Sequence, residues 1–109
     1  MADLEVLAAV RQDGEALAYA STELQADRDV VLAAVLRGGW SIEYASPEVR
    51  ADREVVLVAV QQDWEALEYA SEELRADRKV ALTAVRKDGK ALKYASWYAS
   101  RELRTDREG

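Results

Sequence analysis

Residues 51–75 read ADREVVLVAVQQDWEALEYASEELR, and this stretch decides the fold because close copies of it stand before and after it. The copies are 25 residues apart along the whole chain. A fixed period of this length is typical of proteins built from stacked structural repeats. Four kinds of residue carry the period most clearly: Leu7, Leu32, Leu57 and Leu82; Val10, Val35, Val60 and Val85; Tyr19, Tyr44, Tyr69 and Tyr94; and Asp27, Asp52 and Asp77.

Each unit is expected to begin with a longer α-helix. Asp52 stands just before the apolar run 55–60, where its side chain can accept hydrogen bonds from the free amides of a first helical turn. A run this short could also be a buried strand, because valine favours strands. Alanine in the middle of each run, with Leu and Val repeated at helical spacing, favours a helix with a buried side. We expect each helix to end at a glycine in the left-handed conformation, at Gly14, Gly39 or Gly89.

Two shorter helical turns are expected to complete each unit. The first runs from about Glu15, Trp40, Glu65 or Lys90 to the following Tyr-Ala pair. Pro47 fits the first position of the second turn, because the N–H that proline lacks is not needed there. A serine precedes this turn in each unit and is expected to cap it, the four being Ser21, Ser46, Ser71 and Ser100.

The sequence therefore predicts an all-α fold, a short solenoid of four 25-residue repeats. We place one domain over residues 1–109, with units at about 1–25, 26–50, 51–75 and 76–105 and a truncated fifth start at 106–109. A single unit of this size cannot bury its apolar side alone, so neighbours must stack. Val6, Leu7 and Val10 make the first unit as apolar as the internal ones. We therefore expect either a piece of a longer array or ends that pack on another molecule.

Two departures from the period stand out. Trp64 occupies the place where the other units carry glycine. Residues 97–100, WYAS, repeat the preceding Tyr-Ala-Ser and shift the next landmarks by four residues, which is about one helical turn. The insertion is expected to lengthen a helix by a turn.

The composition argues against an enzyme. The chain has neither Cys nor His, which excludes thiolate chemistry, histidine acid–base catalysis and zinc sites with nitrogen or sulfur ligands. No Gly-rich phosphate loop and no calcium-loop spacing are present. The serines lack a histidine partner, and we interpret the acidic stretch around Glu72 as a solvated helical surface. We predict no catalytic residue, no metal site and no cofactor.

Net charge and hydropathy argue against two classes of partner, nucleic acids and membranes. The formal net charge of −6 disfavours nucleic acid, so we interpret the repeated tyrosines as a core ladder rather than as a platform for bases. No apolar run approaches the roughly 20 residues of a membrane span. We expect a soluble, cytoplasmic protein with no membrane partner.

The charge is distributed unevenly among the units. Residues 1–25, 26–50, 51–75 and 76–109 carry −4, −1, −5 and +4, with Glu65 and Glu68 in the acidic third part and Lys90 and Lys93 in the basic fourth. Such asymmetry can steer a charged partner, or join the acidic part of one copy to the basic part of another. A homo-oligomer, formed by this stacking or through the end faces, is therefore one expectation. The alternative is that the charge simply varies from one solvent-exposed surface to the next, without a binding role.

The tryptophans are the candidate anchors for a protein partner. Trp40 stands at a position that varies between units and is expected to face solvent, and tryptophan is enriched in interface hot spots. Trp64 and Trp97 are further candidates, although Trp64 could instead pack on a neighbouring helix and Trp97 could cover the open end of the last unit. The candidate partner-binding residues are Trp40, Trp64, Trp97, Glu65, Glu68, Lys90 and Lys93.

The paired motifs at residues 52–60 (DREVVLVAV) and 67–75 (LEYASEELR) resemble a tandem helical repeat family of unknown function. That family occurs in multi-repeat proteins of protists and in secreted effectors of intracellular bacteria. The resemblance implies a non-enzymatic module that binds other proteins, and delivery into a host cell as an effector. Two alternatives remain: a small acidic inhibitor that blocks a basic groove of a partner enzyme, and a purely structural or engineered repeat array.

Overall fold

The computed structural model describes residues 3–96, and over this range the chain is all-α, as the sequence predicts. Trp97, Ser100 and the fifth start at 106–109 lie outside the described residues. Each unit contributes a ten-residue α-helix, a 3-10 helix (η) and, in the first three, a four-residue α-helix. The elements are α1 (Asp3–Gln12), η1 (Gly14–Tyr19), α2 (Thr22–Gln25), α3 (Arg28–Arg37), η2 (Gly39–Tyr44), α4 (Pro47–Arg50), α5 (Arg53–Gln62), η3 (Trp64–Tyr69), α6 (Glu72–Arg75), α7 (Arg78–Lys87) and η4 (Gly89–Lys93).

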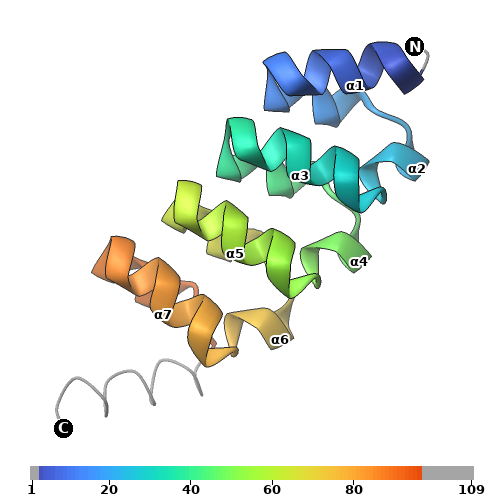
Figure 1. The fold of residues 1–109 in the computed structure, drawn as a ribbon. Coiled ribbons are helices and arrows are strands. Elements are labelled where there is room, and N and C mark those ends of the chain that lie inside the picture. The colour runs from blue at the N-terminus through green and yellow to red at the C-terminus, as the bar shows by residue number, and fades with distance from the viewer. Residues whose placement is uncertain (1–2, 97–109) are drawn as a thin grey trace, which may run out of the picture.

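The long helices α1, α3, α5 and α7 stack side by side, and the short helices α2, α4 and α6 follow one edge of the stack (Figure 1). Each of η1, η2 and η3 packs against the long helix of its own unit and against that of the next. Successive 3-10 helices also contact each other. The molecule therefore has one side made by the long helices and another made by the 3-10 helices.

The predicted caps at the helix starts are confirmed. The Asp52 carboxylate accepts a hydrogen bond from the Val55 amide at 3.2 Å, and Asp27 and Asp77 cap α3 and α7 in the same way. Pro47 stands at the first turn of α4. Serine hydroxyls accept from the third residue of each short helix in the described part, the serines being Ser21, Ser46 and Ser71.

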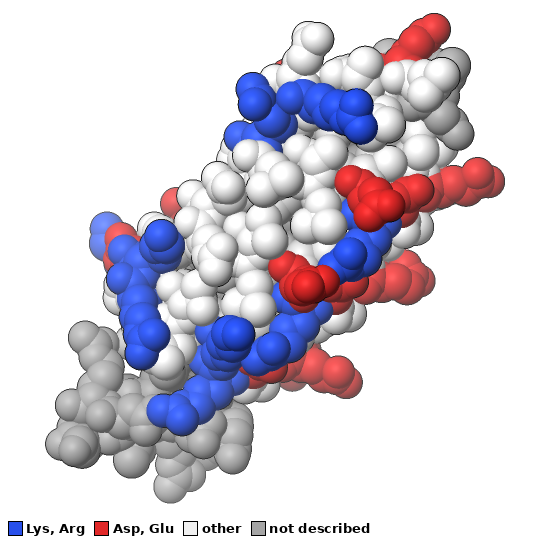
Figure 2. All heavy atoms as spheres, in the orientation of Figure 1, with Lys and Arg blue, Asp and Glu red and all other residues white. Residues whose placement is uncertain are grey.

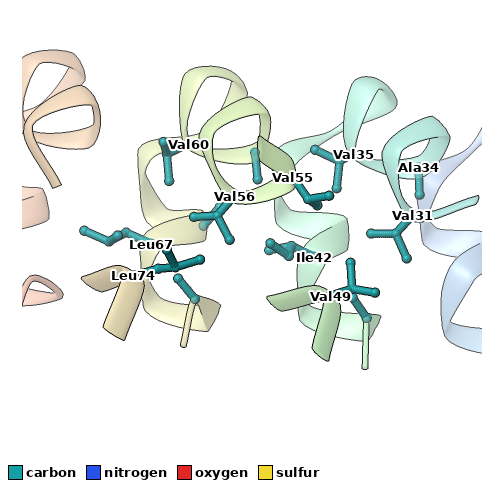
Figure 3. Packing of buried hydrophobic residues seen from close by; sticks show 14 of the residues in the cluster. Val31, Ala34, Val35, Ile42, Val49, Val55, Val56, Val60, Leu67 and Leu74 are labelled. Atoms are coloured by element: carbon teal, nitrogen blue, oxygen red, sulfur yellow. The ribbon is translucent and has the colours of Figure 1, made fainter. Parts of the chain in front are cut away.

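The core forms where successive units meet. Leu67 of η3 and Leu74 of α6 lie under α5, as Ile42 and Val49 lie under α3 (Figure 3). Alanine and valine of the long helices complete it, whereas the repeated leucine, Leu57 in α5, is only partly buried. The valines and alanines, rather than the leucines, therefore carry most of the packing between long helices.

The glycines act differently from the prediction. No described residue has a positive φ, so the left-handed helix stop is wrong. The long helix α5 ends at Asp63 in an extended conformation, and the Asp63 side chain then caps η3 by accepting from the Glu65 amide at 3.0 Å. Because the cap precedes the glycine position, the second element starts one residue earlier than expected and is a 3-10 helix.

Close approach between units explains why glycine is needed instead. A Cβ atom added to Gly39 would lie 2.2 Å from the Ala59 carbonyl oxygen in the next unit, and one added to Gly14 would lie 2.6 Å from the Ala34 oxygen. Both distances are far below van der Waals contact. These positions hold glycine because the backbone of the next long helix passes directly over them.

Polar contacts also repeat between units. The Ser71 amide donates to the Arg50 carbonyl oxygen at 3.0 Å, and equivalent backbone bonds join the other described units. Arg28 pairs with Asp52 at 2.8 Å and contacts Glu54, while Arg53 pairs with Asp77 at 2.9 Å. Figure 2 shows acidic and basic side chains alternating along the edge where the long helices begin.

The first long helix presents both apolar and polar side chains to solvent. Val6 and Val10 are buried inside the stack, whereas Leu4 is 81% exposed. The position that is valine in the next three long helices, such as Val30 in α3, is Glu5 in α1, and Glu5 is exposed.

Candidate functional site

The exposed side of the 3-10 helices forms the candidate site, which we call the aromatic face. A 3-10 helix has about three residues per turn, so the second and fifth residues of each lie on the same side. In η2 these are Trp40 and Glu43, and in η3 they are Glu65 and Glu68; all four are exposed. The aromatic face comprises these positions and the tyrosine ending each segment: Glu15, Tyr19, Trp40, Glu43, Tyr44, Glu65, Glu68, Tyr69, Lys90, Lys93 and Tyr94.

Two large aromatic side chains are exposed on this face. Trp40 has 40% of its surface accessible and packs edge-on against Tyr44, with ring centroids 6.3 Å apart. Tyr19 is 81% exposed, so the prediction that every repeated tyrosine belongs to a core ladder is wrong in the first unit. Tyr44, Tyr69 and Tyr94 are half-buried. The tyrosines thus form a row at the surface, in which the first is exposed and those of the later units are half-buried.

The other two candidate tryptophans are placed differently. Trp64 is half-buried, and its indole packs against the Tyr94 ring of the next unit at 6.1 Å with a tilt of 31°. Trp64 therefore covers a neighbouring unit, the alternative left open by the sequence. Trp97 lies outside the described residues.

Carboxylates surround the tyrosine hydroxyls. The Tyr69 hydroxyl lies beside Glu43, and hydrogen bonding to this carboxylate, together with burial and the charge of Glu68, raises the pKa of Tyr69 to about 12. Burial, followed by the charges of Glu43 and Glu15, raises the pKa of Tyr44. Carboxylates therefore lie close to the tyrosines of the second and third units.

The sign of the face changes at the fourth unit. Lys90 and Lys93 occupy in η4 the positions that Glu65 and Glu68 occupy in η3, and all four are exposed. The Lys93 ammonium lies 5.0 Å from the centroid of the Tyr94 ring. The structure therefore brings the predicted charged residues onto one surface with Trp40.

Sequence reasoning missed Glu43 and the exposure of Tyr19. Glu43 could have been found because it stands 25 residues before Glu68, at the same position of its unit. Tyr19 could not, because the identical residue is half-buried in the later units. Its exposure depends on a neighbour that the first unit does not have among the described residues.

A shallow basic depression lies on the opposite side of the molecule. It is lined along α7 by Lys79, Leu82, Thr83 and Arg86, with Arg78 and the Arg53–Asp77 pair beside them. Residues 3–96 contain no group of three or more acidic side chains arranged to hold a metal ion. In the same range, no helix is long and apolar enough to span a membrane.

Comparison with known proteins identifies the family. No curated protein and no solved structure matches the chain. Residues 5–50 and 52–97 each match the family described as a domain of unknown function, DUF4116. Each match covers two of the 25-residue units, and together they take in most of the chain. The chain therefore belongs to the DUF4116 family and contains two tandem copies of its domain.

Proposed function

We propose that this chain is a non-enzymatic protein-binding module that recognises its partner through the aromatic face. The observation that carries the proposal is the exposure of Trp40 and Tyr19 beside carboxylates on a surface that the fold does not need to cover. Exposed tryptophan and tyrosine supply contact area at low cost in side-chain entropy and dominate many protein interfaces. The two tandem copies of the family's domain also support a binding role, because stacked helical repeats create extended surfaces of the kind that bind other molecules.

A protein fits this face better than a nucleic acid does. Stacking of bases on the tyrosine row would bring phosphates close to Glu15, Glu43 and Glu68, and like charges repel. The same carboxylates favour one further candidate, an acidic inhibitor that occupies a basic groove of an enzyme. The two differ in what the partner loses on binding, since only an inhibitor reduces the partner's activity.

Site-specific photocrosslinking of the full chain tests the proposal. A photoreactive phenylalanine analogue replaces Trp40 on the aromatic face or, as the matched control, Leu36, which is 59% exposed on α3. We expect a discrete protein adduct from position 40 and none from position 36. Adducts from position 36 alone, or from neither position, would contradict the assignment of the face.

A further inference from the structure

We propose that the partner presents an extended, positively charged segment that lies along the aromatic face with an Arg or Lys at about every third residue. This inference rests on the proposed function and names the chemistry of the partner at the same face.

The aromatic rings offer sites for cations. Tyr19 and Trp40 expose ring surface to solvent, and a guanidinium or ammonium group over such a ring is attracted to its negative face. The fourth unit already contains such a contact, because the Lys93 ammonium lies 5.0 Å from the centroid of the Tyr94 ring. Lys93 thus occupies the place that a cation of the partner would take in the first three units.

The carboxylates of the aromatic face in the first three units are not used in the ion pairs between units. Those pairs join Arg28 and Arg53 to acidic side chains at the start of the long helices, and none of them includes Glu15, Glu43, Glu65 or Glu68. The raised pKa values of Tyr44 and Tyr69 show that the carboxylates act on the tyrosine hydroxyls. A cation seated there gains both the ring and a carboxylate at each unit.

The spacing of the units sets the spacing of the cations. Packed helices are about 8–10 Å apart, and an extended chain in the polyproline II conformation advances about 3.1 Å per residue and points every third side chain to the same side. Three residues of an extended segment therefore span about one unit. Cations at positions i, i+3 and i+6 would meet the tyrosines of η1, η2 and η3 in turn.

The fourth unit sets the register of the segment. Lys90 and Lys93 repel a further cation and attract a carboxylate. An acidic residue at i+9 would therefore face η4, if the segment runs from the first unit to the fourth. The direction of the segment along the face is fixed as well, because a reversed segment would place its carboxylate beside Glu15.

Binding of labelled peptides to the full chain tests the inference. The spaced peptide carries Arg at i, i+3 and i+6 and Glu at i+9, and the scrambled peptide has the same composition with the arginines adjacent. Fluorescence anisotropy at low and high salt is expected to give about tenfold tighter binding of the spaced peptide, with both affinities falling as salt rises. Equal affinities for the two peptides would overturn the inference.

Matched variants locate the site. Glu43→Lys on the aromatic face is expected to weaken binding of the spaced peptide about tenfold. Glu73→Lys on α6 makes the same charge change away from η2, so it is expected to have little effect on that binding. Tyr19→Ala removes a largely exposed ring, so it weakens binding without a folding defect. Equal effects of the two charge reversals would overturn the inference.

Two results separate this inference from the proposed function. If a partner is crosslinked at position 40 but the spaced peptide does not bind more tightly than the scrambled one, the inference of a positively charged segment is overturned. The proposal of a protein-binding module is then still supported. A salt-sensitive dimer in light scattering that Lys90→Glu/Lys93→Glu abolishes would identify a second copy of the chain as the occupant. That result too would overturn the inference.

Discussion

Gly39 and Ser41, two residues apart in η2, show how closely successive units approach one another. Gly39 leaves no room for a Cβ atom beneath the Ala59 carbonyl group, and Ser41 is fully buried where the other units carry alanine. The Ser41 hydroxyl has no hydrogen-bond partner among the described residues. The Cβ of an alanine at Gly14 would lie 2.3 Å from this hydroxyl oxygen. Packing therefore leaves no room for a side chain at Gly14 or Gly39.

Gly39→Ala is expected to destabilise the protein by about 1–3 kcal/mol, because α5 must move away to admit the new methyl group. Urea unfolding followed by circular dichroism measures the change. Wild-type stability in this variant would show that the units separate without cost at this point.

Ser41→Ala is expected to raise the free energy of unfolding by about 1 kcal/mol, because it removes a buried hydroxyl without a partner. The substitution copies Ala16, Ala66 and Ala91 of the other units. The same unfolding experiment applies. A loss of stability would show that the hydroxyl is satisfied in solution, for example by an ordered water.

At the scale of the element, Asp52 joins two functions. It caps α5 through the Val55 amide and pairs with Arg28 of the preceding unit. Asp52→Ala removes both the cap and the ion pair and is expected to lower the free energy of unfolding by about 1 kcal/mol. Asp52→Asn keeps a good cap, so its loss of stability is expected to be smaller. Thermal melts of the two variants measure the difference. Equal losses would mean that the ion pair, rather than the cap, is what stabilises this junction.

Acid is expected to weaken the same junctions. Burial opposes ionisation of Asp52 and Asp77, but the amide and arginine hydrogen bonds outweigh it and lower the pKa of both carboxyl groups. The folded pKa values then lie below the unfolded value of about 3.9, so this stabilisation is fully present above about pH 5 and is lost as the pH falls through the lowered values. Urea unfolding from pH 7 to pH 3 tests this. Asp52→Asn/Asp77→Asn should have a flatter pH dependence, and an unchanged slope would contradict the assignment.

The sequence predicts elements whose determinants lie within a unit. The aspartate and serine caps, Pro47 and the long helices follow from local chemistry and are confirmed. The 3-10 geometry, the role of Gly39 and the partial burial of Leu57 depend on how one unit approaches the next. A single unit does not contain that information, so these features were either not predicted from the sequence or predicted incorrectly.

At the scale of the whole molecule, the two sides differ in chemistry. The long-helix side is largely uncharged between its charged edges (Figure 2), whereas the aromatic face carries carboxylates over three units and lysines over the fourth. Trp40 and the charged residues of this face could be predicted because they stand at variable positions of the repeat. Their assembly into one surface with Tyr19 and Glu43 required the stacking of the units.

A titration of the isotope-labelled full chain with the spaced arginine peptide, followed by amide NMR shifts, tests the central claim most directly. The account predicts that the largest shifts fall in η1, η2 and η3, with the tryptophan indole signal of Trp40 among them. The largest shifts in α1, α3, α5 and α7, or shifts spread evenly over the chain, would contradict recognition by the aromatic face.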